Sequence, residues 1–600
     1  MSKDNTRSLA SLTRKYLWDI LAAITISIFT LISLNLAAHY SAVTDEQAHI
    51  PAAYSYVMYG NFSLNPEHPP LAKLIAGLSF IGTHYNFPVN LLNRDNNIGQ
   101  GEWQIGNAFL YSSGNNPDSI LFRSRLPLII FAVILLIVIY LLVRRLFGAK
   151  VALLTLFFTA LSPTVLAHTP LVATDVIVMN TMTIAILVFI SYLKKPSWKM
   201  ALLAGFLMGI AELSKFSAAI LFVIYPLLAI LYFFATKRAE SKRKTILLAM
   251  KSIYKILLIG LGIMYVTYVF QVIHLSQSAQ DTWIKEAMIG TVHSWSWTAT
   301  AMVWLNHVPL MQPVARYIIG FMKAFLRFAD SKGANLLGKD YVGSTPLYFP
   351  VASFLKTPSP LLLLWAAAVV VGLAHFKKSY FSVKKLWRRL LSRMGSDTVV
   401  TSGAIFTILY FIIACSGSLD IGIRHLLPLF PWMSLFSGLF LVHVVEKWRI
   451  KKVPAGKIAS AVVALGFLSI VFIIFPNYLP YSNELVGGAQ NDYLFYNDSN
   501  VDWGQASRYL ASYLKQHPNI TPVYEYYGDP SAYYICGNIN GCPRVRFISS
   551  NQLPPPGSYF AIGETNLTID WGKTSGDPLA YLRHIKPIAR VGDAIYIFRT

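Results

Sequence analysis

The sequence is poor in cysteine and lacks the patterns that usually identify a metal or nucleotide site. Three cysteines among 600 residues exclude a metal cluster built from cysteine ligands. HExxH and CxxC patterns, a glycine loop of the kind that cradles phosphates, internal repeats and low-complexity tracts are also missing from the sequence. Function must therefore be inferred from the distribution of charge and from individual polar residues.

Charged residues are scarce, and acidic ones most of all. They make up 13% of the chain, against 54% hydrophobic residues, and the mean hydropathy is +0.48. This composition excludes a soluble protein with a wet surface and indicates a polytopic membrane protein. With 51 Lys and Arg against 28 Asp and Glu, the net charge is +23. The basic residues cluster between apolar runs, which is typical of membrane orientation signals. No nucleic-acid partner is therefore expected.

Eleven apolar runs are candidates for spans, since a spanning helix needs about 20 residues. They lie at roughly 16–38, 126–143, 151–168, 172–193, 198–213, 216–235, 253–272, 358–375, 399–415, 427–446 and 458–475. Because a basic segment precedes the first run, we predict a retained first helix with a cytoplasmic N-terminus. Alternate threading then assigns more than half of all Lys and Arg to the cytoplasm, in segments 1–15, 144–150, 194–199, 237–255, 377–393 and 447–457. We expect a multi-pass protein of the plasma or inner membrane.

The same threading gives two domains. Residues 1–475 form the transmembrane domain, with extracytoplasmic loops 39–125 and 273–357, and residues 476–600 form an extracytoplasmic domain. In that domain we predict a helix over 503–516 and strands over 522–528, 544–549, 558–563 and 594–600, which make a small α/β unit. Cys536 and Cys542 either close a disulfide loop or are unrelated buried thiols. Apolar spacing over 314–328 predicts a helix that lies in the membrane interface or packs on its own loop.

The first loop gathers charge where a membrane segment ends, which is costly unless chemistry takes place there. Asp45 and Glu46 are followed by His49, and then by His68 and Lys73. A carboxylate can accept a proton from an acceptor group, and a lysine can neutralise a phosphate leaving group. Asp45 also suits a helix cap, Lys73 suits a snorkelling anchor, and His68 suits the end of the turn made by two prolines.

Further charges fall at the predicted outer ends of later spans. Asp175 enters the fourth span, and Glu212 and Lys215 are three residues apart, a spacing that lets them neutralise each other. Arg424 and His425 precede the tenth span; Arg424 can hold a phosphate bidentately or pair with Asp420. The sequence also holds enough residues of the types that bind a divalent metal ion, at a spacing that does not identify a metal site. These ligands are Asp45, His49, His68, His168 and Asp175.

An ordered set of motifs covers residues 15–475. They are Asp45-Glu46, His68-Pro69-Pro70-Leu71-Ala72-Lys73, Leu166-Ala167-His168 with Thr174-Asp175, Leu213-Ser214-Lys215-Phe216-Ser217, Tyr348-Phe349-Pro350-Val351 with Leu355-Lys356-Thr357-Pro358, and Gly422-Ile423-Arg424-His425-Leu426-Leu427-Pro428. As a set they resemble the protein O-mannosyltransferase and aminoarabinose-transferase group of GT-C glycosyltransferases. Residues 497–505, Asn-Asp-Ser-Asn-Val-Asp-Trp-Gly-Gln, are similar to a segment of bacterial members, and no role is assigned to them.

The resemblance implies a mainly α GT-C fold with about eleven transmembrane helices and a small C-terminal α/β domain. It also implies inverting transfer of a sugar from a polyprenyl-phosphate carrier to a hydroxyl on a protein, lipid or glycan outside the membrane. The family's general base maps onto Asp45, with Glu46 beside it. The lysine that holds the lipid phosphate maps onto Lys73, and a second acidic residue maps onto Asp175.

Other residues of the same motifs complete the predicted site. We assign His68, Lys215 and Arg424 to the donor phosphate, and His168 and His425 to the substrate. Glu67-His68 stands where the aminoarabinose branch has a lysine before the paired prolines, which favours the mannosyltransferase-like side.

Two other functions fit parts of the sequence. A flippase or transporter of lipid-linked sugars predicts polar residues along the middle of several helices, whereas the charges here sit mainly at helix ends. A non-catalytic protein that binds envelope glycans would use a platform such as Tyr524, Tyr526 and Tyr527 in the C-terminal domain.

Overall fold

The computed structural model describes residues 3–92, 101–236, 241–289, 296–329, 334–341, 343–374, 383–450, 453–526, 531–537, 542–548, 552–568 and 579–600. The described part is mainly helical, with short strands in the second loop and at the C-terminal end. The predicted fold class, a mainly α membrane protein with a small C-terminal α/β unit, is confirmed.

Eight helical stretches in the described residues are long and apolar enough to cross a membrane. They are Tyr16–His39, Pro117–Phe147, Asp175–Lys194, Phe216–Ala235, Arg243–Val272, Thr398–Ser416, Ile423–Lys447 and Ala455–Ile473. Their helices are α1 (Lys3–His39), α5 (Pro117–Phe147), α8 (Asp175–Lys194), α10 (Leu221–Ala235), α11 (Lys242–Val272), α18 (Thr398–Ser416), α19 (Phe430–His443) and α20 (Ala455–Ile473). The 3-10 helix η6 (Ile423–Leu429) leads into α19.

Three of the eleven predicted runs are not among these eight stretches. Residues 151–168 divide into α6 (Ala149–Ala160) and α7 (Pro163–His168), because Pro163 begins a new helix. Residues 198–213 form α9 (Trp198–Ser214), and residues 358–375 begin with α16 (Ser359–Ala374). A bend of 118° at Pro358 separates α16 from α15 (Tyr348–Lys356), so this pair is a broken span or a re-entrant loop.

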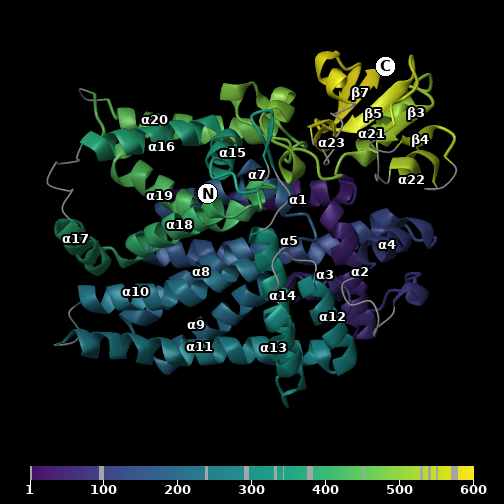
Figure 1. Cartoon of the computed structure of the whole chain (residues 1–600). Helices are drawn as coiled ribbons and strands as arrows, with labels where there is room; N and C mark the ends of the chain where they lie inside the picture. The colour runs from purple at the N-terminus through teal and green to yellow at the C-terminus, as the bar shows by residue number, and fades with distance from the viewer. Residues whose placement is uncertain are drawn as a thin grey trace.

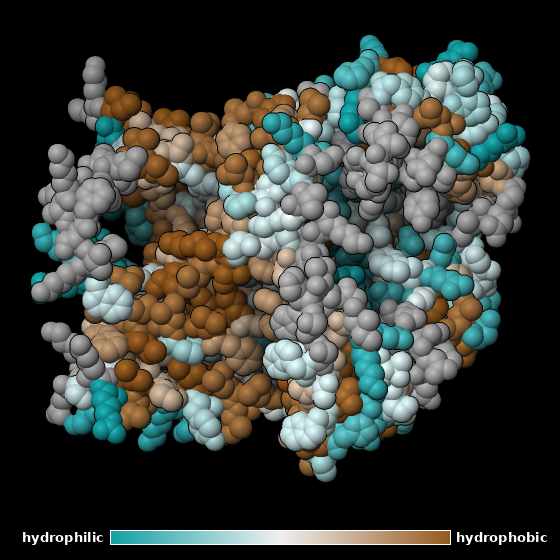
Figure 2. Space-filling model, in the orientation of Figure 1, coloured by the Kyte–Doolittle hydropathy of each residue, from teal (hydrophilic) through white to brown (hydrophobic). Residues whose placement is uncertain are grey.

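The long helices run side by side, and the three long segments between and after them gather towards one end (Figure 1). The first loop holds α2 (Thr44–Tyr59), α3 (Leu71–Gly77) and α4 (Glu102–Asn107). At the other end lies α17 (Val383–Ser396), a basic helix from a segment predicted to be cytoplasmic. Figure 2 shows hydrophobic side chains over the helices and hydrophilic ones over the first loop and the C-terminal unit.

The second loop folds on itself. It contains α12 (Gln277–Ile289), α13 (Ser296–His307), α14 (Gln312–Ala329) and the hairpin of β1 (Ala334–Leu336) and β2 (Lys339–Tyr341). In α14 the predicted helix over 314–328 is confirmed, and buried Ile319 packs on Trp283 and Ile284 of α12. The helix therefore packs on its own loop, while Lys323 and Arg327 pair with Glu67 of the first loop.

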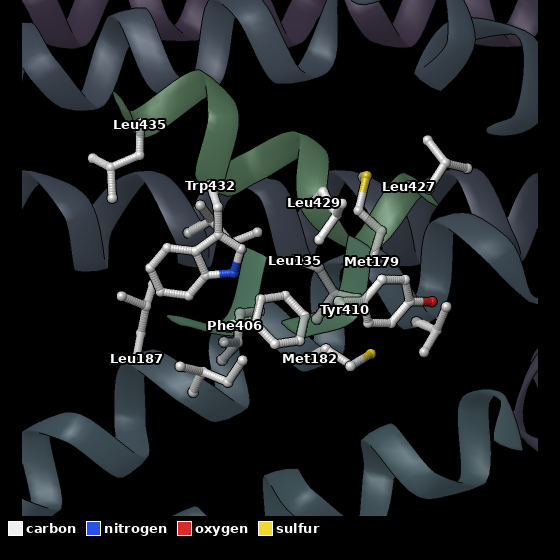
Figure 3. Close-up of a cluster of buried hydrophobic side chains, with 14 of the residues drawn as sticks. Leu135, Met179, Met182, Leu187, Phe406, Tyr410, Leu427, Leu429, Trp432 and Leu435 are labelled. Carbon is white, nitrogen blue, oxygen red and sulfur yellow. The ribbon is translucent and has the colours of Figure 1, made fainter. Parts of the chain in front are cut away.

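The membrane helices share one apolar core. Trp432 of α19 is 1% exposed and lies beside Phe406 of α18, which in turn lies beside Tyr410 (Figure 3). A Cβ atom at Gly403 would lie 2.2 Å from the Trp432 ring, so glycine at this position lets α18 approach α19 closely.

The C-terminal unit is built on a five-stranded sheet. Its order is β4 (Val545–Ile548), β3 (Val523–Tyr526), β5 (Tyr559–Gly563), β7 (Ile595–Arg599) and β6 (Ala589–Val591). The β3 strand pairs parallel with β4 and β5, whereas β7 pairs antiparallel with β5 and β6. All four predicted strands are present, and β6 is an addition. Short helices α21 (Ser507–Gln516), α22 (Ser531–Cys536) and α23 (Glu564–Thr568) complete the unit.

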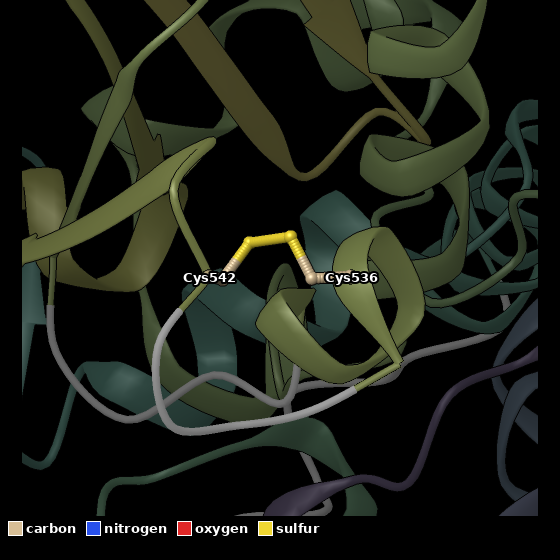
Figure 4. Close-up of a disulfide and its surroundings, with 2 residues drawn as sticks. All are labelled: Cys536 and Cys542. Carbon is tan, nitrogen blue, oxygen red and sulfur yellow. A yellow bond between two sulfur atoms is a disulfide. The ribbon is translucent and has the colours of Figure 1, made fainter.

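The helix predicted over 503–516 begins four residues later, at Ser507, because Trp503 to Ala506 form turns against the first loop. Cys536 and Cys542 form a disulfide (Figure 4), so the first of the two alternatives holds. Of the predicted tyrosine platform, Tyr524 and Tyr526 lie in β3, and Tyr527 lies outside the described residues.

Candidate active site

Asp45 and Arg424 form the centre of the candidate site. Asp45 lies in the first turn of α2, and Arg424 lies at the start of η6, 379 residues later. The Arg424 Nη1 group donates a hydrogen bond of 2.8 Å to Asp45 Oδ2. The Asp45 side chain is 26% exposed and that of Arg424 is 8% exposed. The carboxylate is thus reachable from outside, while its cationic partner is almost enclosed.

A second acid–base pair lies close by. Lys215 Nζ donates a hydrogen bond of 2.5 Å to Oδ1 of Asp175, the first residue of α8. Asp175 also interacts electrostatically with Arg424 and His425. Glu212 is not the partner of Lys215, since its Oε2 accepts a hydrogen bond of 3.1 Å from the Tyr317 hydroxyl. The site therefore holds two carboxylates and two cations drawn from four separate parts of the chain.

Two histidines add polar atoms that the protein leaves unsatisfied. His168 is 3% exposed, and its Nδ1 lies 2.8 Å from the Thr164 carbonyl oxygen. Among the described residues, the Nε2 atoms of His168 and His425 and the Nε atom of Arg424 have no hydrogen-bond partner. Buried polar atoms are normally paired, so such a group is a candidate for ligand binding.

His49 and His68 lie behind Asp45, with ring centroids 5.4 Å apart. Burial is the main reason that the pKa of His49 lies below its ordinary value, and the nearby Lys73 lowers it further, although Asp45 acts in the opposite direction. Burial, with His49 and Lys73, lowers the pKa of His68 well below its ordinary value. Both imidazoles are therefore neutral near pH 7. His49 Nδ1 donates a hydrogen bond of 2.7 Å to the Val172 carbonyl oxygen.

Asp45 is an ionised carboxylate. Burial alone would raise its pKa, but the charge of Arg424, with smaller contributions from His49 and His68, outweighs burial and lowers the pKa below its ordinary value. Asp45 can thus accept a proton at neutral pH, and Arg424 restrains its basicity.

Glu46, predicted beside Asp45 as a catalytic residue, lies in a different environment. Glu46 and Arg125 of α5 have fully buried side chains and form a salt bridge of 2.5 Å. The other Arg125 N–H groups donate to the carbonyl oxygens of Ala37, Tyr40 and Ser41. Glu46 therefore joins α1, α2 and α5 and does not face the Asp45–Arg424 pair. The sequence analysis did not anticipate Arg125.

Lys73, predicted to hold the donor phosphate, is also buried, with 1% exposure. Its amino group donates to Asn65 O at 2.6 Å, Asn65 Oδ1 at 2.9 Å and His68 O at 2.9 Å. An ammonium group has three N–H bonds, so all of them are used inside the protein. Burial lowers the pKa of Lys73 to about 7. In this arrangement Lys73 supports the turn that carries His68 and makes no contact with Asp45.

An apolar groove of about 350 Å³ shares the helix η6 with the site. Its walls come from α15, α16, α18, η6 and α19, and they include Ile423 and Leu426, which flank Arg424 and His425 in the chain. Ser353, Lys356 and Ser434 add polar atoms to the lining. The groove is apolar and large enough to hold part of a hydrocarbon chain.

The metal hypothesis finds no support in the geometry. Among the described residues, no group of three or more His, Cys, Asp and Glu side chains is placed to hold a metal ion. Asp45, His49, His68, His168 and Asp175 are all described, and their carboxylates pair with Arg424 and Lys215 instead.

The site contains two residues that the sequence analysis did not assign. Trp503 lies with its ring 4.0 Å from the Arg424 guanidinium carbon, and Asp498 interacts electrostatically with Arg424. Both come from residues 497–505, the segment noted for its similarity to bacterial proteins. That similarity was the only signal that pointed to them.

Comparisons with known proteins agree with the motifs. Residues 117–270 match the family model described as dolichyl-phosphate-mannose-protein mannosyltransferase. This match confirms the resemblance to the mannosyltransferase-like group, and it includes Asp175 and Lys215 but not Asp45 or Arg424. A search of curated proteins finds no match.

The solved structures that are similar to the chain are distant in sequence. The chain is similar to ArnT from Cupriavidus metallidurans bound to undecaprenyl phosphate, with 13% identity over 97% of this chain and 98% of that one and a TM-score of 0.43. It is also similar to the oligosaccharyltransferase AglB from Archaeoglobus fulgidus in complex with an inhibitory peptide and a dolichol-phosphate. That match has 13% identity over 90% of this chain and 61% of that one, with a TM-score of 0.41.

Proposed function

We propose that the protein is a membrane glycosyltransferase that moves a sugar from a polyprenyl-phosphate carrier to a hydroxyl group of a protein, lipid or glycan, with inversion at the anomeric carbon. The observation that carries this proposal is the Asp45–Arg424 pair, whose arginine lies in the same short helix, η6, as Ile423 and Leu426 of the apolar groove. A partly exposed carboxylate pairs with a buried guanidinium, and the helix that carries the guanidinium also lines the groove, an arrangement that suits a lipid-borne phosphosugar and its acceptor.

Two cations suit the donor phosphate. Arg424 uses Nη1 to hold Asp45, and its buried Nε atom is available to a phosphate oxygen. Lys215, 14% exposed and paired with Asp175, supplies a second positive charge. The isoprenoid chain would lie along Ile423 and Leu426 in the groove. Of the four predicted phosphate ligands, Arg424 and Lys215 are the two that we retain as direct ligands.

Asp45 is the proposed general base. It takes the proton of the acceptor hydroxyl while the acceptor oxygen bonds to the anomeric carbon. The bond from that carbon to the phosphate oxygen breaks, and the polyprenyl phosphate leaves with the electron pair. Arg424 and Lys215 stabilise the charge that develops on the phosphate. The Nε2 atoms of His168 and His425 are placed to bind sugar hydroxyls or the phosphate.

The location of the charges supports transfer over transport. Asp175 begins α8, Lys215 directly follows α9, and Arg424 precedes α19, so the charged groups lie at helix ends. A flippase would need polar groups along the path through the membrane. The disulfide between Cys536 and Cys542 supports placing this end of the molecule on the extracytoplasmic side, where the redox environment preserves disulfides.

The test measures transfer from polyprenyl-phosphate sugars to an envelope extract by the purified protein in liposomes. Asp45→Asn should slow transfer on the order of 10²–10⁴-fold with little change in the affinity for polyprenyl phosphate, as expected for a general base. Arg424→Gln should weaken that affinity.

Lys323→Gln is the matched control, because Lys323 is a cation of the second loop that pairs with Glu67 of the first loop and not with Asp45 or Asp175. Lys323→Gln should retain both the rate of transfer and the affinity for polyprenyl phosphate. Normal turnover of Asp45→Asn would refute the assignment of the base.

A further inference from the structure

Residues 497–505 connect the membrane helices to the α/β unit, and they contact both halves of the candidate site. On the Arg424 side, the Ser499 hydroxyl donates a hydrogen bond of 2.6 Å to the Ile421 carbonyl oxygen. The Ile423 N–H group donates a hydrogen bond of 2.9 Å to Asn500 Oδ1. These two bonds hold the backbone immediately before Arg424.

The approach on this side is too close for a larger residue. Gly422 has a φ of 154°, and a Cβ atom there would lie 2.3 Å from Ser499 Oγ. Glycine at this position therefore lets residues 497–505 lie directly on the loop that carries Arg424.

On the Asp45 side, the same segment holds the start of α2. The Thr44 N–H group donates a hydrogen bond of 2.9 Å to the Trp503 carbonyl oxygen, and the Ser41 N–H group donates one of 3.1 Å to the Gln505 carbonyl oxygen. Arg508, in the first turn of α21, pairs with Asp118 at the start of α5 and donates from its backbone to Ser41 Oγ. Residues 497–505 thus contact the chain on both sides of the Asp45–Arg424 pair.

Two side chains of residues 497–505 also interact with Arg424. Trp503 is 6% exposed, and its ring lies against the guanidinium group at 4.0 Å. An arginine stacked on a desolvated indole is held in plane and in place. Asp498 adopts a φ of 59°, which is uncommon for a residue other than glycine and often marks a functional constraint. Its carboxylate interacts with both Arg424 and Asp45.

We propose that residues 497–505 belong to the active site and set the distance between the general base and the phosphate-binding arginine. Trp503 positions the guanidinium group of Arg424, and Ser499 positions the backbone before it. This inference rests on the proposed function. It gives the C-terminal unit a direct part in donor binding, because that unit supplies the segment that braces Arg424.

The experiment measures binding of undecaprenyl phosphate to the full-length protein in nanodiscs, together with donor KM and kcat. Trp503→Leu should weaken binding on the order of tenfold and raise the donor KM more than it lowers kcat, since it releases Arg424 without touching Asp45. Trp503→Phe, which keeps an aromatic face, should restore most of the affinity. Ser499→Ala should weaken binding about threefold, because it removes one hydrogen bond from the loop.

Trp283→Leu is the matched control. Trp283 is 3% exposed and stacks on the buried Arg316 at 4.6 Å in the second loop, away from the groove. Its loss should lower stability but leave the affinity of the folded protein for undecaprenyl phosphate unchanged. Equal losses in Trp283→Leu and Trp503→Leu would overturn the proposal, because the effect would then be general destabilisation.

The possible results separate the two proposals. If the wild type binds undecaprenyl phosphate and both Trp503→Leu and Ser499→Ala bind it equally well, the positioning role is wrong and the proposed function stands. If Trp503→Leu does not fold, Ser499→Ala decides by the same comparison. If the wild type itself does not bind, the proposed function fails and this inference fails with it.

Discussion

Asp45 and Glu46 are adjacent in the sequence, yet their loss should have opposite consequences. Glu46→Gln should destabilise the protein and leave the chemistry of the folded fraction intact. Asp45→Asn should preserve stability and abolish most transfer. The contrast arises because the Glu46 side chain is fully buried against Arg125, whereas that of Asp45 is 26% exposed beside Arg424.

The size of the effect at Glu46 follows from its hydrogen bonds. Its two carboxylate oxygens accept from Arg125 Nε at 2.8 Å, Arg125 Nη2 at 2.5 Å, the Val43 N–H at 3.0 Å and the Val172 N–H at 2.9 Å. Glutamine would replace one oxygen with an N–H donor and leave the Arg125 charge unpaired. Breaking a buried ion pair in this way costs about 3–5 kcal/mol, a large share of the roughly 5–15 kcal/mol that stabilises a typical protein.

Asp45→Asn should cost much less, about 1 kcal/mol, since its side chain is 26% exposed and asparagine keeps an oxygen that can accept the hydrogen bond from Arg424. Asp175 and Asp498 also remain near Arg424 to offset its charge.

The assay is thermal unfolding in detergent, followed by tryptophan fluorescence and size-exclusion chromatography, with transfer measured per amount of folded protein. Glu46→Gln should lower the midpoint by several degrees, and Asp45→Asn should lie close to the wild type. A Glu46→Gln protein that unfolds at the wild-type temperature but transfers no sugar would refute this reasoning and show that Glu46 takes part in catalysis.

Three further predictions follow from the same contacts. Arg424→Gln should move the acid limb of the kcat/KM profile to higher pH. Arg424 lowers the pKa of Asp45, so without Arg424 the active, ionised carboxylate is protonated at a higher pH as the pH falls. Residual activity that keeps the wild-type acid limb would contradict this prediction. Lys215→Met should weaken polyprenyl phosphate binding on the order of tenfold, measured in nanodiscs, and an unchanged affinity would remove Lys215 from the phosphate site. The double variant Cys536→Ser, Cys542→Ser should destabilise the α/β unit by about 2 kcal/mol, because the disulfide closes only a short loop, and it should still transfer the sugar. Limited proteolysis with and without reductant measures the loss of stability. Loss of transfer at full stability would contradict the expectation that transfer persists.

Much of the fold was predictable because its signals are local. A membrane span requires a run of apolar residues, and eight of the eleven predicted runs coincide with long helices. The four predicted strands are present for the same reason, since alternation and turn residues are read within a few positions. Residues 151–168 show the limit of this signal: the apolar pattern predicts one span, but Pro163 begins a new helix and divides the run into α6 and α7.

The ion pairs of the site were not predictable, because proximity in the sequence favours the wrong partners. Glu212 and Lys215 are three residues apart, but Lys215 lies just beyond α9 with an extended backbone of φ −161° and ψ 143°. Its side chain therefore leaves the helix surface, where the three-residue spacing would apply, and reaches Asp175. Asp420 is close to Arg424 in the chain, yet its Oδ2 accepts a hydrogen bond from the Thr345 N–H group.

Hydrogen-bond satisfaction separates Arg125 and Lys73 from Arg424. Arg125 and Lys73 donate all their N–H groups to protein oxygens, so each is held as part of the scaffold. Arg424, in contrast, keeps a buried Nε without a partner among the described residues. A buried N–H group without a partner lowers the stability of the folded protein, and its cost is not offset by any hydrogen bond formed on folding. The motif around Asp45 marks a region of concentrated charge, but only the three-dimensional pairing separates the charges that brace the site from those that can bind a phosphate.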